Sequence, residues 1–123
     1  MRTAFAATAA FFVLASAAAA APVMTVNSAK GGVLAGENGM TLYTFQKDAK
    51  GMSNCYDACA ANWPPLAAAE GDKADGPYSV IARKDGSYQW AKDGKPLYFW
   101  VKDEKKGDIT GDGVNGAWDL ARP

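Results

Sequence analysis

Two cysteines, Cys55 and Cys59, are the only thiols in this 123-residue chain and the first candidates for chemistry. On a helix, a separation of four residues brings two Cα atoms to roughly 6 Å, which a disulfide can span. A thiol–disulfide exchanger is the functional interpretation. However, the spacing is C-x-x-x-C, and no Lys, Arg or His lies between or directly beside the cysteines to lower a thiol pKa. We therefore expect an unreactive structural disulfide.

An aspartate-rich loop near the C-terminus has the ligand spacing of a calcium loop. Oxygen-bearing side chains stand at positions 1, 3, 5 and 12 of this loop, namely Asp108, Thr110, Asp112 and Asp119. Calcium prefers such clustered oxygens, but position 12 usually carries the longer, bidentate Glu. A turn-rich β connection uses the same residue types for backbone geometry. We expect no cofactor, and weak calcium binding at these four residues is the alternative.

Two aspartates, Asp48 and Asp103, follow aromatic segments at matching places. Paired carboxylates can act as acid and base in sugar hydrolysis. Their repetition favours a structural role instead, in which each caps a turn by accepting backbone N–H bonds.

The aromatic side chains of these segments could face a sugar or quinone ligand. We expect them in the core, with the tyrosine hydroxyls at the rim, and keep a ligand groove as the alternative. They are Tyr43, Phe45, Tyr98 and Trp100.

Composition excludes several classes of function. The chain has no histidine, so it has no Ser-His-Asp or Cys-His nucleophile and no imidazole base or metal ligand. It has neither a Walker A loop nor a dinucleotide fingerprint. Thirteen basic and thirteen acidic residues balance, and no basic stretch carries interleaved aromatics, so a nucleic-acid partner is not expected. Enzymatic activity is not expected either.

The first residues have the pattern of a secretory signal. Arg2 precedes an apolar stretch, and an alanine run offers small residues at a cleavage site. We predict a signal peptide over residues 1–20 and a single secreted domain over 21–123. No second apolar span follows, so no membrane span is expected after cleavage. The predicted location is periplasmic or secreted, where an oxidising environment favours the disulfide.

An internal repeat organises the rest of the chain. The segment 42–48 returns at 97–103, an offset of 97 − 42 = 55 residues, and the same offset pairs Trp63 with Trp118. The chain is therefore two copies of one unit, about 23–68 and 78–123. Isolated hairpins are marginal in water, so the two copies must pack together.

Each copy has turn residues spaced as expected between three antiparallel strands. Asn38-Gly39 and Asp93-Gly94 tolerate the positive φ angles of type I′ turns and indicate hairpins. The fold class is all-β: two three-stranded antiparallel meander repeats packed as one pseudo-symmetric domain. The predicted strands are Val23–Ser28, Val33–Gly36 and Met40–Gln46 in the first copy, and Tyr78–Arg83, Ser87–Lys92 and Lys95–Val101 in the second.

The segments after the two meanders differ. In the first copy, residues 53–62 suit a short helical turn that carries both cysteines, is capped by Ser53 or Asn54, and ends before Pro64. Residues 67–76 form the joint between the copies and should be exposed. In the second copy, a polar, glycine-rich loop spans residues 107–116.

Two long motifs carry a family resemblance. They are L-Y-T-F-x-K-D-x-x-G-x-S-x-C-x-x-x-C-A-x-x-W-P-P-L and G-K-P-L-Y-x-W-x-K-D-x-x-x-G-D-x-T-G-D-G-V-N-G-x-W. The chain resembles the bacterial secreted-repeat or predicted-lipoprotein family with a Y-x-[FWY]-x-x-D motif. That resemblance implies a location outside the cytoplasm and a paired-repeat β architecture, and it supplies no catalytic residues. The chain departs from the family in lacking a lipid-bearing cysteine near its start and in having Asp119, rather than histidine, after the final tryptophan.

These observations favour an exported, non-catalytic binding or scaffolding module for an unknown envelope or extracellular ligand. The alternative is a periplasmic redox or metal-handling accessory protein. It would act through Cys55 and Cys59 or through the loop from Asp108 to Asp119.

Overall fold

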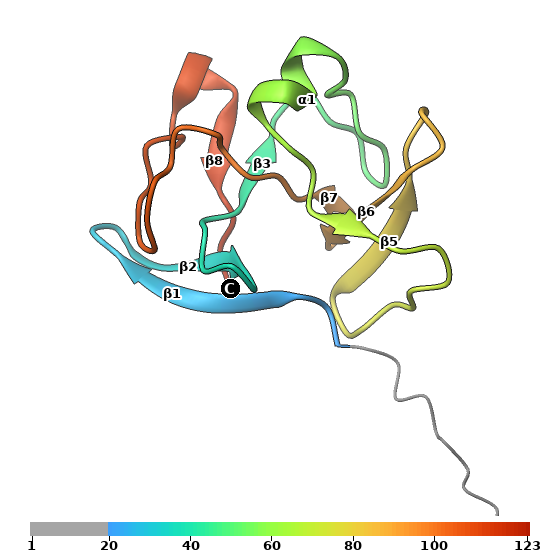
Figure 1. Cartoon of the computed structure of the whole chain (residues 1–123), viewed down its shortest axis with the longest axis horizontal. Helices are drawn as coiled ribbons and strands as arrows, with labels where there is room; N and C mark the ends of the chain where they lie inside the picture. Colours follow the sequence, from blue (N-terminus) through green and yellow to red (C-terminus); the bar gives the residue numbers. More distant parts are fainter. Residues whose placement is uncertain (1–19) are drawn as a thin grey trace, which may run out of the picture.

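A computed structural model describes residues 20–123, so almost all of the predicted signal peptide lies outside the described residues. The described chain is built mainly of short antiparallel strands, with one short α-helix and one 3-10 turn (Figure 1). Within this part, no helix has the length and apolar character needed to cross a membrane. The elements are β1 Val23–Ser28, β2 Gly31–Gly36, β3 Tyr43–Phe45, α1 Ala58–Asn62, β4 Ala67–Ala68, β5 Tyr78–Ala82, β6 Tyr88–Lys92, β7 Lys95–Pro96, η1 Val114–Gly116 and β8 Trp118–Leu120.

β1 pairs with β2 and β5 pairs with β6, each in antiparallel register. The two predicted type I′ turns have different outcomes. The prediction is wrong for Asn38-Gly39, where only Gly39 has a positive φ angle and the loop from 37 to 39 has three residues. Asp93 and Gly94 have φ angles of 50° and 80°, so the turn between β6 and β7 has the positive φ values that a two-residue I′ turn requires. The predicted fold class is confirmed: a β protein of two repeats with one short helix that carries a disulfide.

The offset of 55 is not constant through the central strands. Leu34 and Trp90 occupy equivalent places, because their N–H groups donate to Ala121 and Leu66, each over 2.9 Å. Their offset is 90 − 34 = 56, whereas the two acceptors are separated by 121 − 66 = 55. The offset of 55 therefore does not extend to β2 and β6, where these equivalent residues lie 56 apart.

Turn lengths explain the shift of one residue. In the first repeat the β1–β2 turn has two residues (29–30), and the next loop has three (37–39). In the second repeat the order is reversed, with three residues (84–86) followed by two (93–94). The longer loop follows the central strand in the first repeat and precedes it in the second. The two differences cancel, so the offset of 55 applies again after the second loop.

The third strands are shorter than predicted. Met40–Gln46 contains only β3, and Lys95–Val101 contains only β7. After each short pairing the chain turns towards the other repeat. There the Tyr43 N–H donates to the Tyr98 carbonyl over 2.8 Å, and the Tyr98 N–H donates back over 3.0 Å. The two segments thus meet at the centre of the molecule instead of completing separate meanders.

Each repeat also gives its last strand to the other. β4 of the first repeat pairs with β6 of the second, and β8 of the second pairs with β3 of the first (Figure 1). The predicted exposed joint, 67–76, therefore begins with a paired strand, and only its remainder is mostly exposed. This exchange makes the two repeats one body.

A column of four aromatic rings fills the interior between the repeats. Trp63 and Trp118 stack at a centroid distance of 3.7 Å. Trp100 extends the column beyond Trp63 at 4.0 Å, and Phe45 extends it beyond Trp118 at 4.3 Å. Each half of the column contains rings from both repeats, so neither copy encloses its own aromatic side chains.

The helix differs from the prediction at its start. α1 covers Ala58–Asn62, and Asp57 precedes it without a side-chain capping bond. Ser53 and Asn54, the predicted caps, are used elsewhere: Ser53 contacts Tyr98, and the Asn54 amide donates to the Lys47 carbonyl. Tertiary partners have therefore replaced the local capping role that their residue types favour.

Candidate functional site

Two tyrosine–aspartate bonds connect the repeats reciprocally. The Tyr43 hydroxyl donates to Asp103 over 2.6 Å, and the Tyr98 hydroxyl donates to Asp48 over 2.7 Å. The expectation that these hydroxyls lie at the rim is wrong, because both tyrosines are fully buried. The remaining oxygen of each aspartate accepts a backbone N–H, as a turn cap would. The two carboxylates belong to separate structural bonds and do not share one site.

Burial dominates the electrostatics of these pairs. It raises the pKa of Tyr43 far above the ordinary value of 10.0, and the bond to Asp103 raises it further. Burial also raises the pKa of Tyr98. For Asp48, burial raises the carboxyl pKa, while bonds from Asn54 and Tyr98 and the charge of Arg83 lower it. The tyrosines therefore stay protonated and act as donors.

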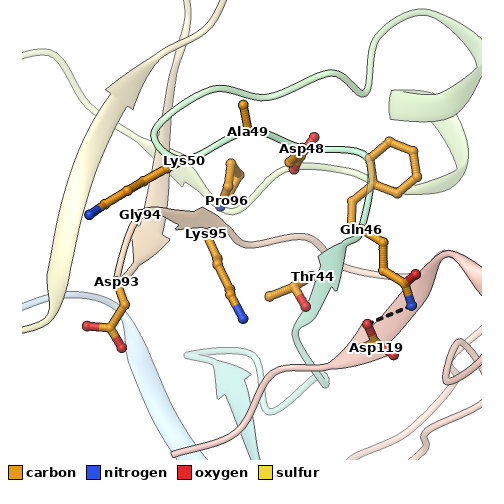
Figure 2. Close-up of a pocket in the computed structure, with 11 residues that line it drawn as sticks. Thr44, Gln46, Asp48, Ala49, Lys50, Asp93, Gly94, Lys95, Pro96 and Asp119 are labelled. Atoms are coloured by element: carbon orange, nitrogen blue, oxygen red, sulfur yellow. Dashed lines mark hydrogen bonds between the residues drawn. The ribbon is translucent and has the colours of Figure 1, made fainter.

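A cleft of about 450 Å³ is lined by residues of both repeats (Figure 2). It lies between the β3–β8 pair, the loop after β3 and the turn between β6 and β7. A second hollow of about 380 Å³ shares four lining residues with it, namely Thr44, Asp93, Lys95 and Asp119. The residues that line the first cleft are Thr44, Phe45, Gln46, Asp48, Ala49, Lys50, Asp93, Gly94, Lys95, Pro96 and Asp119.

The two repeats carry different residues at two positions of this cleft. The offset of 55 places Thr44 opposite Phe99 and Asp119 opposite Pro64. The Phe99 ring of the second repeat packs so closely over Gly36 of the first that an added Cβ would lie 2.6 Å from Phe99 Cζ. Thr44 is too short to cover the equivalent strand, so the corresponding space beside it stays open.

The cleft carries both charges. The Gln46 amide donates to Asp119 over 3.0 Å, and Figure 2 shows the Lys95 side chain extending towards Thr44. Neither ion pair found among residues 20–123 involves the cleft, since they join Lys30 to Asp112 and Arg83 to Asp85. Ammonium and carboxylate groups thus remain available to a ligand in the same cleft.

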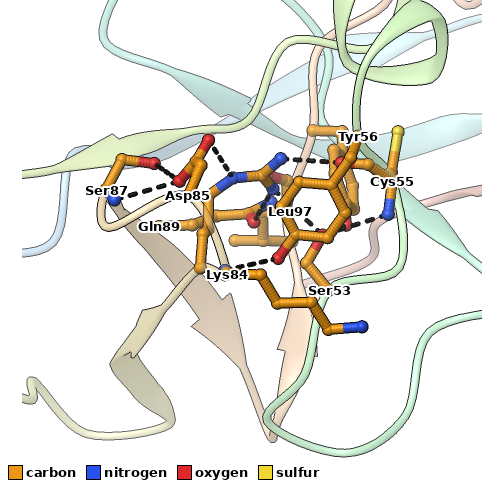
Figure 3. A network of polar contacts seen from close by, with 10 residues as sticks. Ser53, Cys55, Tyr56, Lys84, Asp85, Ser87, Gln89 and Leu97 are labelled. Carbon is orange, nitrogen blue, oxygen red and sulfur yellow. Dashed lines mark hydrogen bonds and ion pairs between the residues drawn. The ribbon is translucent and has the colours of Figure 1, made fainter.

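Arg83 is a buried arginine. Its bonding partners Ser53, Cys55 and Gln89 belong to the polar network in Figure 3. Its Nη1 donates to Ser53 over 3.0 Å and to Gln89 over 2.7 Å, and its Nη2 donates to the Cys55 carbonyl over 2.6 Å. The guanidinium carbon lies 4.5 Å from the ring centre of Tyr56. Sequence reasoning missed Arg83, because an arginine directly before a Lys-Asp-Gly turn reads as an exposed residue.

The predicted disulfide joins Cys55 to Cys59, with their Cα atoms 5.2 Å apart. Cys55 is fully buried and Cys59 is half-buried. The predicted lack of thiol reactivity stays a prediction.

The four predicted calcium ligands have separate partners. Asp108 accepts the N–H groups of Glu104 and Lys105, which lower its pKa. Thr110 donates to Asp103, and Asp112 pairs with Lys30. Asp119 accepts the Gln46 amide in the cleft. Within residues 20–123, no three His, Cys, Asp or Glu side chains gather to hold a metal ion, and calcium binding stays an untested alternative.

The four candidate ligand-facing aromatics divide into two groups. Tyr43 and Tyr98 have no exposed surface and belong to the core. Phe45 and Trp100 are half-buried at the two ends of the aromatic column. Phe45 also lines the cleft, so it is the one of the four that contributes to the candidate site.

Comparison with known proteins supports the repeat organisation. A family model described as a secreted repeat of unknown function matches the chain twice, over residues 24–67 and 79–122. No curated protein and no solved structure matches the chain. The double match agrees with the family resemblance and with the predicted location outside the cytoplasm.

Proposed function

Because the chain belongs to this family of secreted repeats of unknown function, we propose that it is an exported, non-catalytic binding module whose ligand occupies the cleft beside Thr44. In a duplicated protein, features shared by both copies are explained by the fold they build. A feature present in one copy needs another explanation. The open cleft beside Thr44, whose equivalent residue Phe99 packs closely over Gly36, is the observation that carries this proposal.

The chemistry of the cleft favours a small polar ligand that carries both charges. Lys50 and Lys95 supply ammonium groups, while Asp93 and Asp119 supply carboxylates. A volume of about 450 Å³ suits a small molecule. A zwitterion would meet opposite charges at both ends, whereas a ligand of one sign would leave half of these groups unmatched.

The absence of histidine supports a binding role over catalysis. The cleft offers no imidazole as a general base, and Asp48 already accepts two hydrogen bonds. The alternative within this proposal is a scaffolding module that binds no small ligand. It predicts no response to small molecules.

A titration followed by two-dimensional amide NMR tests the binding role. The probes are glycine and γ-aminobutyrate as zwitterions, with acetate and ethylammonium as single-charge controls. We expect the zwitterions to shift the amide signals of Thr44, Lys95 and Asp119 more than either control does. A Thr44→Phe variant, which copies the residue of the other repeat, should lose the response. Equal small shifts with all four probes would contradict binding of zwitterions.

A further inference from the structure

We propose that Arg83 and the Cys55–Cys59 disulfide are positioning elements that fix the Asp48 carboxylate at the wall of the cleft. This inference rests on the proposed function, because it concerns a residue that lines the same cleft. It assigns a role to a buried cation that the fold alone does not require.

A continuous chain of hydrogen bonds connects the arginine to the aspartate. The Arg83 guanidinium donates to Ser53 over 3.0 Å, and the Ser53 and Tyr98 hydroxyls lie 2.6 Å apart. The Tyr98 hydroxyl donates its one proton to Asp48, so the Ser53 hydroxyl must be the donor in its bond with Tyr98. Every donor in the chain therefore points towards the carboxylate, and the bonds polarise one another in the same direction.

The disulfide holds the other side of this network. Arg83 donates to the carbonyl of Cys55, which the bond to Cys59 ties to α1. The neighbouring Asn54 N–H donates to Asp48 over 2.7 Å. The segment 53–55 is thus bound to the arginine, to the disulfide and to the aspartate. A change at the disulfide can therefore alter the position of Asp48 through this short segment.

The other repeat provides a natural comparison, because Asp103 lacks this support. The offset of 55 places Ser28 opposite Arg83, and Thr110 and Val114 opposite the two cysteines. There Tyr43 receives the Gly111 N–H in place of a hydroxyl that is bonded to an arginine. The tyrosine–aspartate bond forms on both sides, so it does not need the arginine. The arginine and the disulfide occur on the side where the aspartate borders an open cleft.

Arg83 has an incomplete set of partners for a buried cation. Its side chain is only 2% exposed, and its Nε has no hydrogen-bond partner among the described residues. The nearest carboxylate is that of Asp85, 3.8 Å from Nε and itself half-exposed. Burial of a charge is costly when its ion pair is long and the partner is half-exposed, as it is here. A role in holding Asp48 explains why this position carries an arginine.

The test measures the ionisation of Asp48 in the absence of any ligand, so its failure would leave the binding proposal standing. Carboxyl carbon NMR follows Asp48 and Asp103 through an acid titration, with Asp103 as the internal reference. Besides Arg83, the charged groups that border Asp48 in the cleft are Lys50, Lys95, Asp93 and Asp119. These are unchanged in every variant.

Arg83→Met removes the charge, and we expect Asp48 to titrate at higher pH than in the unmodified protein, with no matching change at Asp103. Arg83→Lys keeps a charge and should restore part of the difference. Arg122→Met is the matched control, because Arg122 also bonds backbone carbonyls but lies on the exposed surface.

The paired Cys55→Ala, Cys59→Ala variant should shift Asp48 in the same direction with the arginine present. It also keeps the test informative if Arg83→Met does not fold. An unchanged Asp48 titration in either folded variant would overturn the proposal. So would equal changes at Asp48 and Asp103, since these would indicate a general loosening of the structure.

Discussion

At the residue scale, each tyrosine of the Y-x-[FWY]-x-x-D motif bonds the aspartate of the other repeat. Tyr43 bonds Asp103, and Tyr98 bonds Asp48, so each motif is completed only by its copy. The sequence predicts the turn-capping half of each aspartate's role, because that half is local. It does not predict the tyrosine partner, which is 60 residues away for Tyr43.

Removal of one hydroxyl should destabilise the protein through the carboxylate left behind. We expect Tyr43→Phe to lower the free energy of unfolding by about 2 kcal/mol, because Asp103 stays buried with one partner fewer. Urea denaturation measures this loss. In a double-mutant cycle with Asp103→Asn, the two single losses should exceed the loss in the double variant. Additive losses would show that the bond contributes nothing.

The buried tyrosines also predict how stability depends on alkaline pH. Their pKa values in the folded protein are raised above the unfolded value of 10.0, chiefly by burial. The folded state therefore keeps these protons longer, and stability falls once pH rises above about 10, where only the unfolded chain releases them. Denaturation midpoints measured between pH 8 and pH 11 should show this fall. The fall should be smaller in Tyr98→Phe, and an equal slope would contradict the account.

At the scale of elements, the sequence predicts the hairpins well and the exchanged strands poorly. Turn residues such as Asp93-Gly94 carry a local signal, and β1 has the predicted bounds. β4 and β7 contain two residues each, too few for any periodic pattern. Packing between the repeats decides which strands they pair with, so the local sequence does not predict this pairing. The cleft is missed for the same reason, since it depends on which edge Thr44 faces.

A glycine in β2 tests the packing that fills the place equivalent to the cleft. We expect Gly36→Ala to destabilise the protein by about 1–3 kcal/mol, because the new methyl group would collide with the Phe99 ring. Gly32→Ala is the matched control on the same strand, where the added carbon would lie 3.4 Å from Thr25. Thermal unfolding compares the two variants. A second change, Phe99→Thr, should relieve the strain, and equal stability of the two glycine variants would contradict the packing described.

The disulfide closes a short ring, and its contribution to stability should be correspondingly modest. In the chain-entropy treatment, removing it by Cys55→Ala, Cys59→Ala costs about 2 kcal/mol. The native bond should also be inert, since Cys55 is buried. Chemical denaturation measures the first quantity. A thiol reagent applied to native protein after brief exposure to a mild reductant tests the second, and rapid labelling would favour the redox alternative.

At the scale of the whole molecule, duplication is the property that sequence reveals most clearly. The repeated segments at 42–48 and 97–103 predict two copies in one body, and the structure adds the manner in which they join. Exchanged strands, reciprocal tyrosine–aspartate bonds and a shared aromatic column all cross between the copies. The symmetry also exposes the candidate site, because the cleft and Arg83 are departures from it. The cleft and Arg83 are recognised as differences between the repeats only when equivalent positions of the two copies are compared.

The central claim is that the repeats form a single cooperative unit, since each lacks part of its sheet and core without the other. Residue-resolved NMR during urea unfolding tests it most directly, with Val26 reporting on the first repeat and Ile81 on the second, both being buried strand residues. We predict that the native signals of both residues disappear at the same urea concentration. Loss of one signal while the other keeps its native position and intensity would contradict the account.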